Sequence, residues 1–132
     1  MSQQNVEALR PVYAAWEQGD FTSSLPLFHE TVTLAVDPDI PDGGTYEGMD
    51  GVLAYTSRFL EPWESLTISA ESFEVAGERV LVKVHQAGIG TGSGAPVTID
   101  YFQVWTFSGD RVVRLEVIMS EERAREGLVA GS

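Results

Sequence analysis

The chain has 132 residues, of which 43% are hydrophobic and 21% are charged, a composition typical of one globular domain with its own core. Its formal net charge of −12 argues against nucleic acid or an anionic membrane surface as a partner, because both require a basic face. The absence of cysteine excludes disulfides and thiol chemistry, and two distant histidines make a metal site improbable. No apolar run is long enough to span a membrane, and the N-terminus lacks signal-peptide features, so we expect a cytoplasmic protein. We also expect that it uses no metal and no cofactor.

The first half of the chain predicts three helices. Apolar residues recur at helical spacing over residues 6–19, and a second, short helix is expected over residues 21–29. Residues 31–36 are typical of a strand, and the Pro- and Gly-rich residues 37–44 predict an irregular loop. A third helix is expected over residues 49–61.

The second half predicts a sheet. Strands are expected over residues 66–75 and 80–86, followed by a flexible Gly-rich connection over residues 88–94. Residues 97–119 form two alternating arms around Ser108-Gly109-Asp110, which is typical of a tight antiparallel hairpin. A short helix with acidic residues in its first turn is expected from Ser120 onward.

Alternation along these strands predicts which side chains face the interior, provided that no strand is bulged. Lys83 should face outward and take His85 with it, and Asp100 should face outward on the next strand. The expected inward set is Val80, Val82, Val84, Gln86, Ile99, Tyr101, Gln103, Trp105, Phe107, Val113, Leu115, Val117 and Met119.

Four segments in this order resemble the nuclear transport factor 2-like superfamily, which includes the SnoaL-like polyketide cyclases and the ketosteroid isomerases. They are residues 13–21 (YAAWEQGDF), 27–34 (LFHETVTL), 46–52 (YEGMDGV) and 104–113 (VWTFSGDRVV). The resemblance covers nearly the whole chain and implies a single domain over residues 1–132. It implies a cone-shaped α+β barrel, with three N-terminal helices packed in a strongly curved antiparallel sheet and a pocket open at one end. It further implies a homodimer formed through the outer face of the sheet.

Asp37 is the leading candidate for a catalytic residue. It follows a predicted strand that should enter the cone, and a carboxylate beside an apolar pocket has a raised pKa suited to a general base. Asp37-Pro38 also resembles the proton-shuttling Asp and the Pro after it in ketosteroid isomerases. The alternative is that Asp37 only caps a turn, as Asp before Pro commonly does.

The residues that would hold a substrate oxygen remain open. Ketosteroid isomerases use a Tyr and a protonated Asp for this purpose, and the resemblance offers Tyr13 and Asp100 for these roles. Alignment on Gly19-Asp20 instead places Val12 at the Tyr position, and alignment on the hairpin at residues 106–109 places Gln103 at the Asp position. We therefore take Gln103 as the candidate partner of Asp37. His29 is expected to act structurally at a helix end, and His85 would become a candidate base only if a bulge turned it inward.

Aromatic residues exceed the needs of a minimal core, so some are expected to line the pocket. The expected pocket residues are Tyr13, Trp16, Tyr55, Phe59, Trp63, Tyr101 and Trp105. This composition predicts binding of a small, mostly apolar molecule. The resemblance implies that this molecule is polyketide- or steroid-like and that cofactor-free isomerase, cyclase or hydratase chemistry takes place at Asp37. The alternative is a non-catalytic ligand-binding or dimeric interaction module. A hydrolase built on an Asp/Arg pair lacks support, because no Arg takes an inward strand position.

Overall fold

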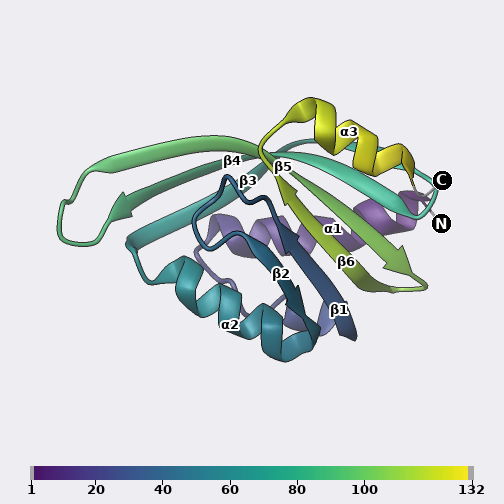
Figure 1. The fold of residues 1–132 in the computed structure, drawn as a ribbon, viewed down its shortest axis with the longest axis horizontal. Helices are drawn as coiled ribbons and strands as arrows, with labels where there is room; N and C mark the ends of the chain where they lie inside the picture. The colour runs from purple at the N-terminus through teal and green to yellow at the C-terminus, as the bar shows by residue number, and fades with distance from the viewer. Residues whose placement is uncertain (1, 131–132) are drawn as a thin grey trace.

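The structure, a computed structural model, describes residues 2–130, which form three α-helices, one short 3-10 helix and one curved, unclosed six-stranded sheet (Figure 1). In chain order the elements are α1 (Ser2–Glu17), η1 (Leu25–Leu27), β1 (Phe28–Val36), β2 (Gly44–Glu47), α2 (Gly48–Leu60), β3 (Trp63–Ala76), β4 (Arg79–Gly90), β5 (Pro96–Ser108), β6 (Arg111–Ile118) and α3 (Glu121–Ala130). The α+β cone expected from the sequence is confirmed.

The sheet is mixed. Its strand order is β2-β1-β6-β5-β4-β3, and β1 pairs in parallel with β6 while every other neighbouring pair is antiparallel. The parallel pair brings the end of β1 beside the end of β6, where Val36 lies opposite Val117. This pairing places Asp37, the residue after β1, at the rim of the sheet beside the C-terminal part of the chain.

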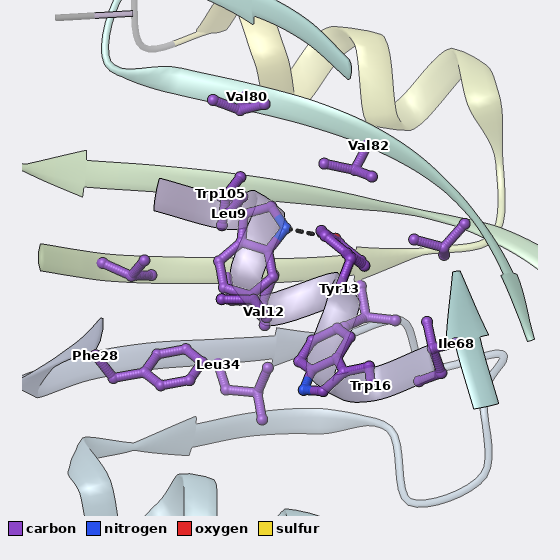
Figure 2. Packing of buried hydrophobic residues seen from close by; sticks show 14 of the residues in the cluster. Leu9, Val12, Tyr13, Trp16, Phe28, Leu34, Ile68, Val80, Val82 and Trp105 are labelled. Atoms are coloured by element: carbon purple, nitrogen blue, oxygen red, sulfur yellow. Dashed lines mark hydrogen bonds between the residues drawn. The ribbon is translucent and has the colours of Figure 1, made fainter. Parts of the chain in front are cut away.

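The two faces of the sheet are covered by different helices. Side chains of α1 pack with inward residues of β4 and β5, and Figure 2 shows Leu9, Val12 and Tyr13 among Val80, Val82 and Trp105. On the opposite face, Ala124 and Leu128 of α3 cover Leu81 and Val104 in a second cluster. Because neighbouring strand residues point to opposite faces, Leu81 faces outward and is nevertheless buried.

The prediction of a helix over residues 21–29 is wrong. Asp20 accepts hydrogen bonds from the backbone N–H groups of Thr22 and Ser23, as a helix cap would, but only the 3-10 turn η1 follows. Phe28 already begins β1, and burial alternates regularly along the strand from Val32 to Val36. His29 therefore lies in a strand rather than at a helix end, and its Nδ1 contacts the Thr31 hydroxyl at 2.8 Å.

Most inward assignments hold, with one local exception. A register shift at Thr106/Phe107 places Val112, rather than Val113, in the core. Such a bulge reverses the facing of the strand locally, as expected for an extra residue in one strand. The sequence pattern does not predict the strand β2, whose four residues run from the end of the loop expected over residues 37–44 to just before the helix expected over residues 49–61.

Candidate functional site

The interior of the cone contains two adjoining cavities. The inner cavity, of about 80 Å³, lies between the inner face of the sheet, η1 and α2. Its walls are mostly apolar, and the residues that line it are Trp16, Phe21, Ser24, Leu25, Phe28, Leu34, Val52, Tyr55, Thr56, Phe59, Ile68, Tyr101, Gln103, Leu115 and Val117.

The outer cavity, of about 300 Å³, lies towards the rim and is also largely apolar. Its lining consists of Ile40, Pro41, Asp42, Tyr55, Arg58, Phe59, Pro62, Trp63, Gln86, Val97, Thr98, Ile99, Tyr101, Val117 and Met119. Tyr55, Phe59, Tyr101 and Val117 line both cavities, so the two cavities adjoin at these largely aromatic side chains.

A buried hydrogen-bond chain orients Gln103 at the inner cavity. The Trp105 indole N–H donates to the Tyr13 hydroxyl at 2.9 Å, shown by the dashed line in Figure 2, and that hydroxyl donates to Gln103 Oε1. Because the indole N–H can only donate, the Tyr13 oxygen accepts from it, and the Tyr13 proton is left for the glutamine carbonyl. The Gln103 Nε2 group has no hydrogen-bond partner within residues 2–130, and Gln103 lines the cavity.

The tyrosines of the interior stay protonated at neutral pH. Burial raises the pKa of Tyr13 and of Tyr101 well above the ordinary value. Burial also raises the pKa of Tyr55 to about 12, with the nearby Tyr46 and Asp42 adding to the rise. Their hydroxyls therefore act as neutral hydrogen-bonding groups.

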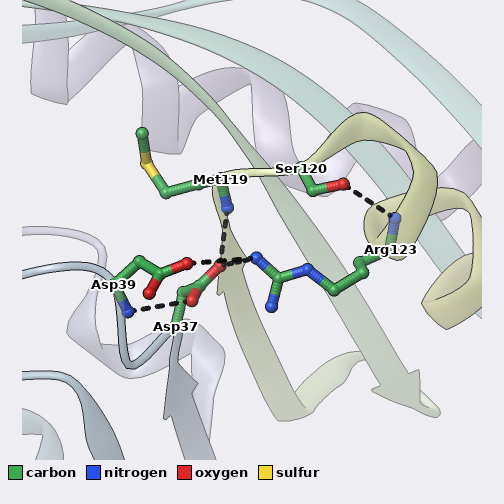
Figure 3. A network of polar contacts seen from close by, with 5 residues as sticks. All are labelled: Asp37, Asp39, Met119, Ser120 and Arg123. Carbon is green, nitrogen blue, oxygen red and sulfur yellow. Dashed lines mark hydrogen bonds and ion pairs between the residues drawn. The ribbon is translucent and has the colours of Figure 1, made fainter.

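Asp37 is buried but is engaged in a network of its own, shown in Figure 3. Its Oδ2 accepts from the Met119 backbone N–H at 3.0 Å and from Arg123 Nη2 at 2.6 Å, and its Oδ1 accepts from the Asp39 N–H at 3.0 Å. Its side chain is 1% exposed, whereas that of Arg123 is 48% exposed. Asp37 thus joins the end of β1, the end of β6 and α3.

The expected rise in the pKa of Asp37 is wrong. The Met119 and Asp39 backbone N–H groups and the Arg123 guanidinium hold the pKa of this carboxyl below its ordinary value, despite its burial. Asp37 also lines neither cavity. A carboxylate held in this way suits a structural anchor rather than a general base.

The expected pocket aromatics divide into two groups. Trp16, Tyr55, Phe59, Trp63 and Tyr101 line one or both cavities. Tyr13 and Trp105 do not; Trp105 is fully buried, and Tyr13 acts through its hydrogen bond to Gln103.

The structure places His85 and Asp100 together on the outer face of the sheet. His85 Nδ1 lies 2.7 Å from Asp100 Oδ1, and the two residues are directly paired between the neighbouring strands β4 and β5. They are therefore separated from the cavities by the sheet, and Asp100 is not the polar partner inside the cone. Gln103 occupies that position.

Several polar cavity residues, among them Gln86, Asp42 and Arg58, were not chosen from the sequence. Alternation placed Gln86 inward, but no signal marked it as a binding residue, and its amide now lies at the outer cavity beside Tyr101. Asp42 and Arg58 line the same cavity, but they lie in a loop and in α2, where the alternation of strand residues makes no prediction.

Within residues 2–130, no group of three or more His, Cys, Asp or Glu side chains is placed to hold a metal ion. No helix in that range is long and apolar enough to cross a membrane.

Comparisons with solved structures agree on the fold. A protein of unknown function from Burkholderia pseudomallei K96243, described as nuclear transport factor 2-like, matches with a TM-score of 0.79 and 23% identity, over 98% of both chains. TerC, co-crystallised with polyporic acid, matches with a TM-score of 0.76 and 22% identity, over 96% of this chain and 98% of that one. A putative SnoaL-like polyketide cyclase from Jannaschia sp. CCS1 matches with a TM-score of 0.77 and 16% identity, over 98% of this chain and 94% of that one.

No protein with curated annotation matches the chain significantly. The family model of the SnoaL-like domain, however, matches residues 9–115, which include the C-terminal part of α1, most of the residues that line the cavities and most of the sheet. The chain belongs to the SnoaL-like domain family.

Proposed function

We propose that this protein binds a small, mostly apolar molecule within the cone, with the Gln103 amide donating a hydrogen bond to an oxygen of that molecule. The observation that carries this proposal is the pair of adjoining apolar cavities, into which one oriented amide donor faces. Apolar walls with a few placed polar groups are typical of small-molecule sites. The polyporic acid in TerC and the polyketide cyclase description of another structural neighbour fit a ligand that contains rings.

Binding is favoured over turnover at Asp37. A general base has to reach its substrate and needs a pKa near the working pH. Asp37 lies outside both cavities, and its carboxylate already accepts three hydrogen bonds. Isomerase, cyclase or hydratase chemistry would therefore need another carboxylate, and Asp42, at the outer cavity, is the candidate that the geometry offers.

A substitution that fills the inner cavity tests the proposal. Val52 lines this cavity and is 5% exposed, whereas its neighbour Leu53 is 46% exposed. We expect Val52→Phe to weaken binding of the steroid probe androstenedione at least about tenfold, because the added ring occupies the ligand's space. Quenching of tryptophan fluorescence measures the affinity, since Trp16 and Trp63 line the cavities.

Leu53→Phe is the matched control and should bind as the unmodified protein does. Melting temperatures of both variants show whether the fold is retained. Equal affinities for Val52→Phe and Leu53→Phe, with both folded, would place the ligand elsewhere and contradict the proposal.

We also propose that the protein forms a homodimer through the part of the outer sheet face that α3 leaves uncovered, around Lys83, His85 and Asp100. Lys83 and Asp100 are exposed there, while Leu81 and Val104 are covered by α3. Sedimentation equilibrium tests this proposal: a dimer mass that falls to the monomer mass in His85→Glu supports it, and a monomer mass for the unmodified protein contradicts it.

A further inference from the structure

A second buried tyrosine–glutamine pair lies at the outer cavity. The Tyr101 hydroxyl donates to Gln86 Oε1 at 2.7 Å, and the two residues are 6% and 4% exposed. Burying an amide in an apolar wall is unfavourable unless its polar atoms find partners. A glutamine at this position therefore calls for an explanation beyond packing.

Only half of the Gln86 amide is satisfied. Its Oε1 accepts from Tyr101, but its Nε2 has no hydrogen-bond partner within residues 2–130. Gln86 lines the outer cavity, beside apolar groups such as those of Ile99 and Trp63. An amide N–H₂ group that faces such a space is positioned to donate to an acceptor that enters it.

The pair repeats the arrangement of Tyr13 and Gln103 at the inner cavity. In each, a tyrosine hydroxyl whose pKa is raised by burial occupies the glutamine carbonyl and leaves the N–H₂ group free. Gln86 lies opposite Ile99 on β5, and Gln103 lies four residues further along that strand. At the rise of a strand, the two glutamines are about 13 Å apart along the sheet. Tyr101 lies between them and lines both cavities.

We propose that the ligand carries a hydrogen-bond-accepting oxygen at each of its two ends, as in a rigid polycyclic diketone, with one oxygen on Gln103 Nε2 and the other on Gln86 Nε2. This inference rests on the proposed binding function and specifies its ligand. Ketones suit the site better than alcohols, because both glutamine carbonyls already accept a hydrogen bond from a tyrosine hydroxyl and the remaining amide N–H groups can only donate. A neutral ligand suits it better than an anion, because one acidic and one basic side chain, Asp42 and Arg58, line the outer cavity and the chain has a net charge of −12.

The test compares three rigid probes by tryptophan fluorescence: androstenedione, with a ketone on each terminal ring; the matched monoketone; and the hydrocarbon androstane. We expect the diketone to bind about tenfold more tightly than the monoketone, and the monoketone more tightly than androstane, since each ketone adds one hydrogen bond. Gln86→Met, which keeps the length of the side chain but has no donor, should bring diketone affinity down to the monoketone level. Gln103→Met should do the same, and neither variant should change androstane affinity by more than about twofold.

Gln86→Glu distinguishes loss of the hydrogen bond to the ligand from loss of the hydrogen bond that holds Tyr101 in the folded protein. It keeps a carboxylate oxygen for the Tyr101 hydroxyl and removes the N–H₂ donors, so it should weaken diketone binding at least as much as Gln86→Met does. Diketone affinity that is unchanged in both Gln86 variants but weakened by Gln103→Met would overturn the two-donor inference while the proposed function stands. Diketone affinity equal to that of androstane in the unmodified protein would overturn both, because neither glutamine would then donate to the ligand. Failure of all three probes to bind would overturn the proposed function and this inference with it.

Discussion

Asp37 shows how one carboxylate can hold the rim of the cone together. Its backbone N–H donates to the Val117 carbonyl at 2.8 Å, and its carboxylate accepts from Met119, Asp39 and Arg123. Val117 and Met119 also line the outer cavity. The carboxylate is therefore a positioning group for the cavity wall, and its charge stabilises the fold.

This role predicts a specific pH dependence. Since the pKa of Asp37 is lower in the folded protein than its ordinary value of 3.8, its contribution to stability is complete above that value and is lost as the pH falls through the folded-state pKa. We expect Asp37→Asn to lower the free energy of unfolding by about 1–3 kcal/mol at neutral pH. The loss should shrink as the pH falls below about 3.8 and through the lower folded-state pKa, where the carboxyl of the folded, unmodified protein also becomes protonated.

Urea unfolding at a series of pH values measures this difference. Asp39→Asn is the control, because Asp39 is 79% exposed and lies 3.8 Å from the same guanidinium. It should follow the profile of the unmodified protein. A pH-independent difference between Asp37→Asn and the unmodified protein would contradict the assignment.

The sequence predicted the positions of the residues inside the cone more accurately than the contacts at its rim. Alternation on a long strand correctly placed Gln103 and Tyr101 inside, because neighbouring side chains must point to opposite faces. The pKa of Asp37 was predicted in the wrong direction, since its partner Arg123 lies 86 residues further along the chain. No local pattern indicates that contact, which depends on the parallel pairing of β1 with β6.

At the scale of elements, α3 covers part of the outer face of the sheet. Ala124 and Leu128 pack on Leu81 and Val104, and Arg125 contacts Glu74 of β3 at 2.5 Å. The same helix carries Arg123 to Asp37 at the cavity rim. One short helix thus connects the outer face of the sheet with the wall of the site.

Truncation of one side chain tests the packing of α3. Leu128 is 6% exposed and its neighbour Val129 is 58% exposed. We expect Leu128→Ala to lower the free energy of unfolding by about 2 kcal/mol or more, because it leaves a cavity against Leu81 and Val104. Val129→Ala should change it by less than about 0.5 kcal/mol. Equal effects in urea unfolding would show that α3 does not dock as described.

The helices and strands were predicted correctly where the hydrophobic pattern extends over many residues, and incorrectly where it covers only a few. The helices and the long hairpin strands were recognised with small errors at their ends. Residues 21–29 contain apolar side chains at a spacing that suits either a helix or a strand. Pairing of Phe28 with Val112 on β6 favours the strand, and the sequence around residues 21–29 cannot indicate this pairing with a distant part of the chain.

At the scale of the whole molecule, the curvature of the sheet creates the site. Helices α1 and α2 fill part of the concave face, and the remaining space forms the two cavities between the sheet and α2. The long strands β4 and β5 extend past both cavities, so that Gln86 and Gln103 come from the same pair of strands. The fold thus supplies two adjoining apolar cavities, each lined by one buried glutamine.

The side-chain amide resonances of the glutamines, followed by ¹⁵N NMR during titration with androstenedione, test the binding claim most directly. We predict that the N–H₂ signals of Gln103 and Gln86 shift with ligand, because each amide then gains an acceptor. The Gln3 signal should stay in place, because that amide lies on the surface and donates to Glu7 at 3.1 Å. Binding that shifts surface amides while the Gln103 signal remains unchanged would contradict a ligand site inside the cone.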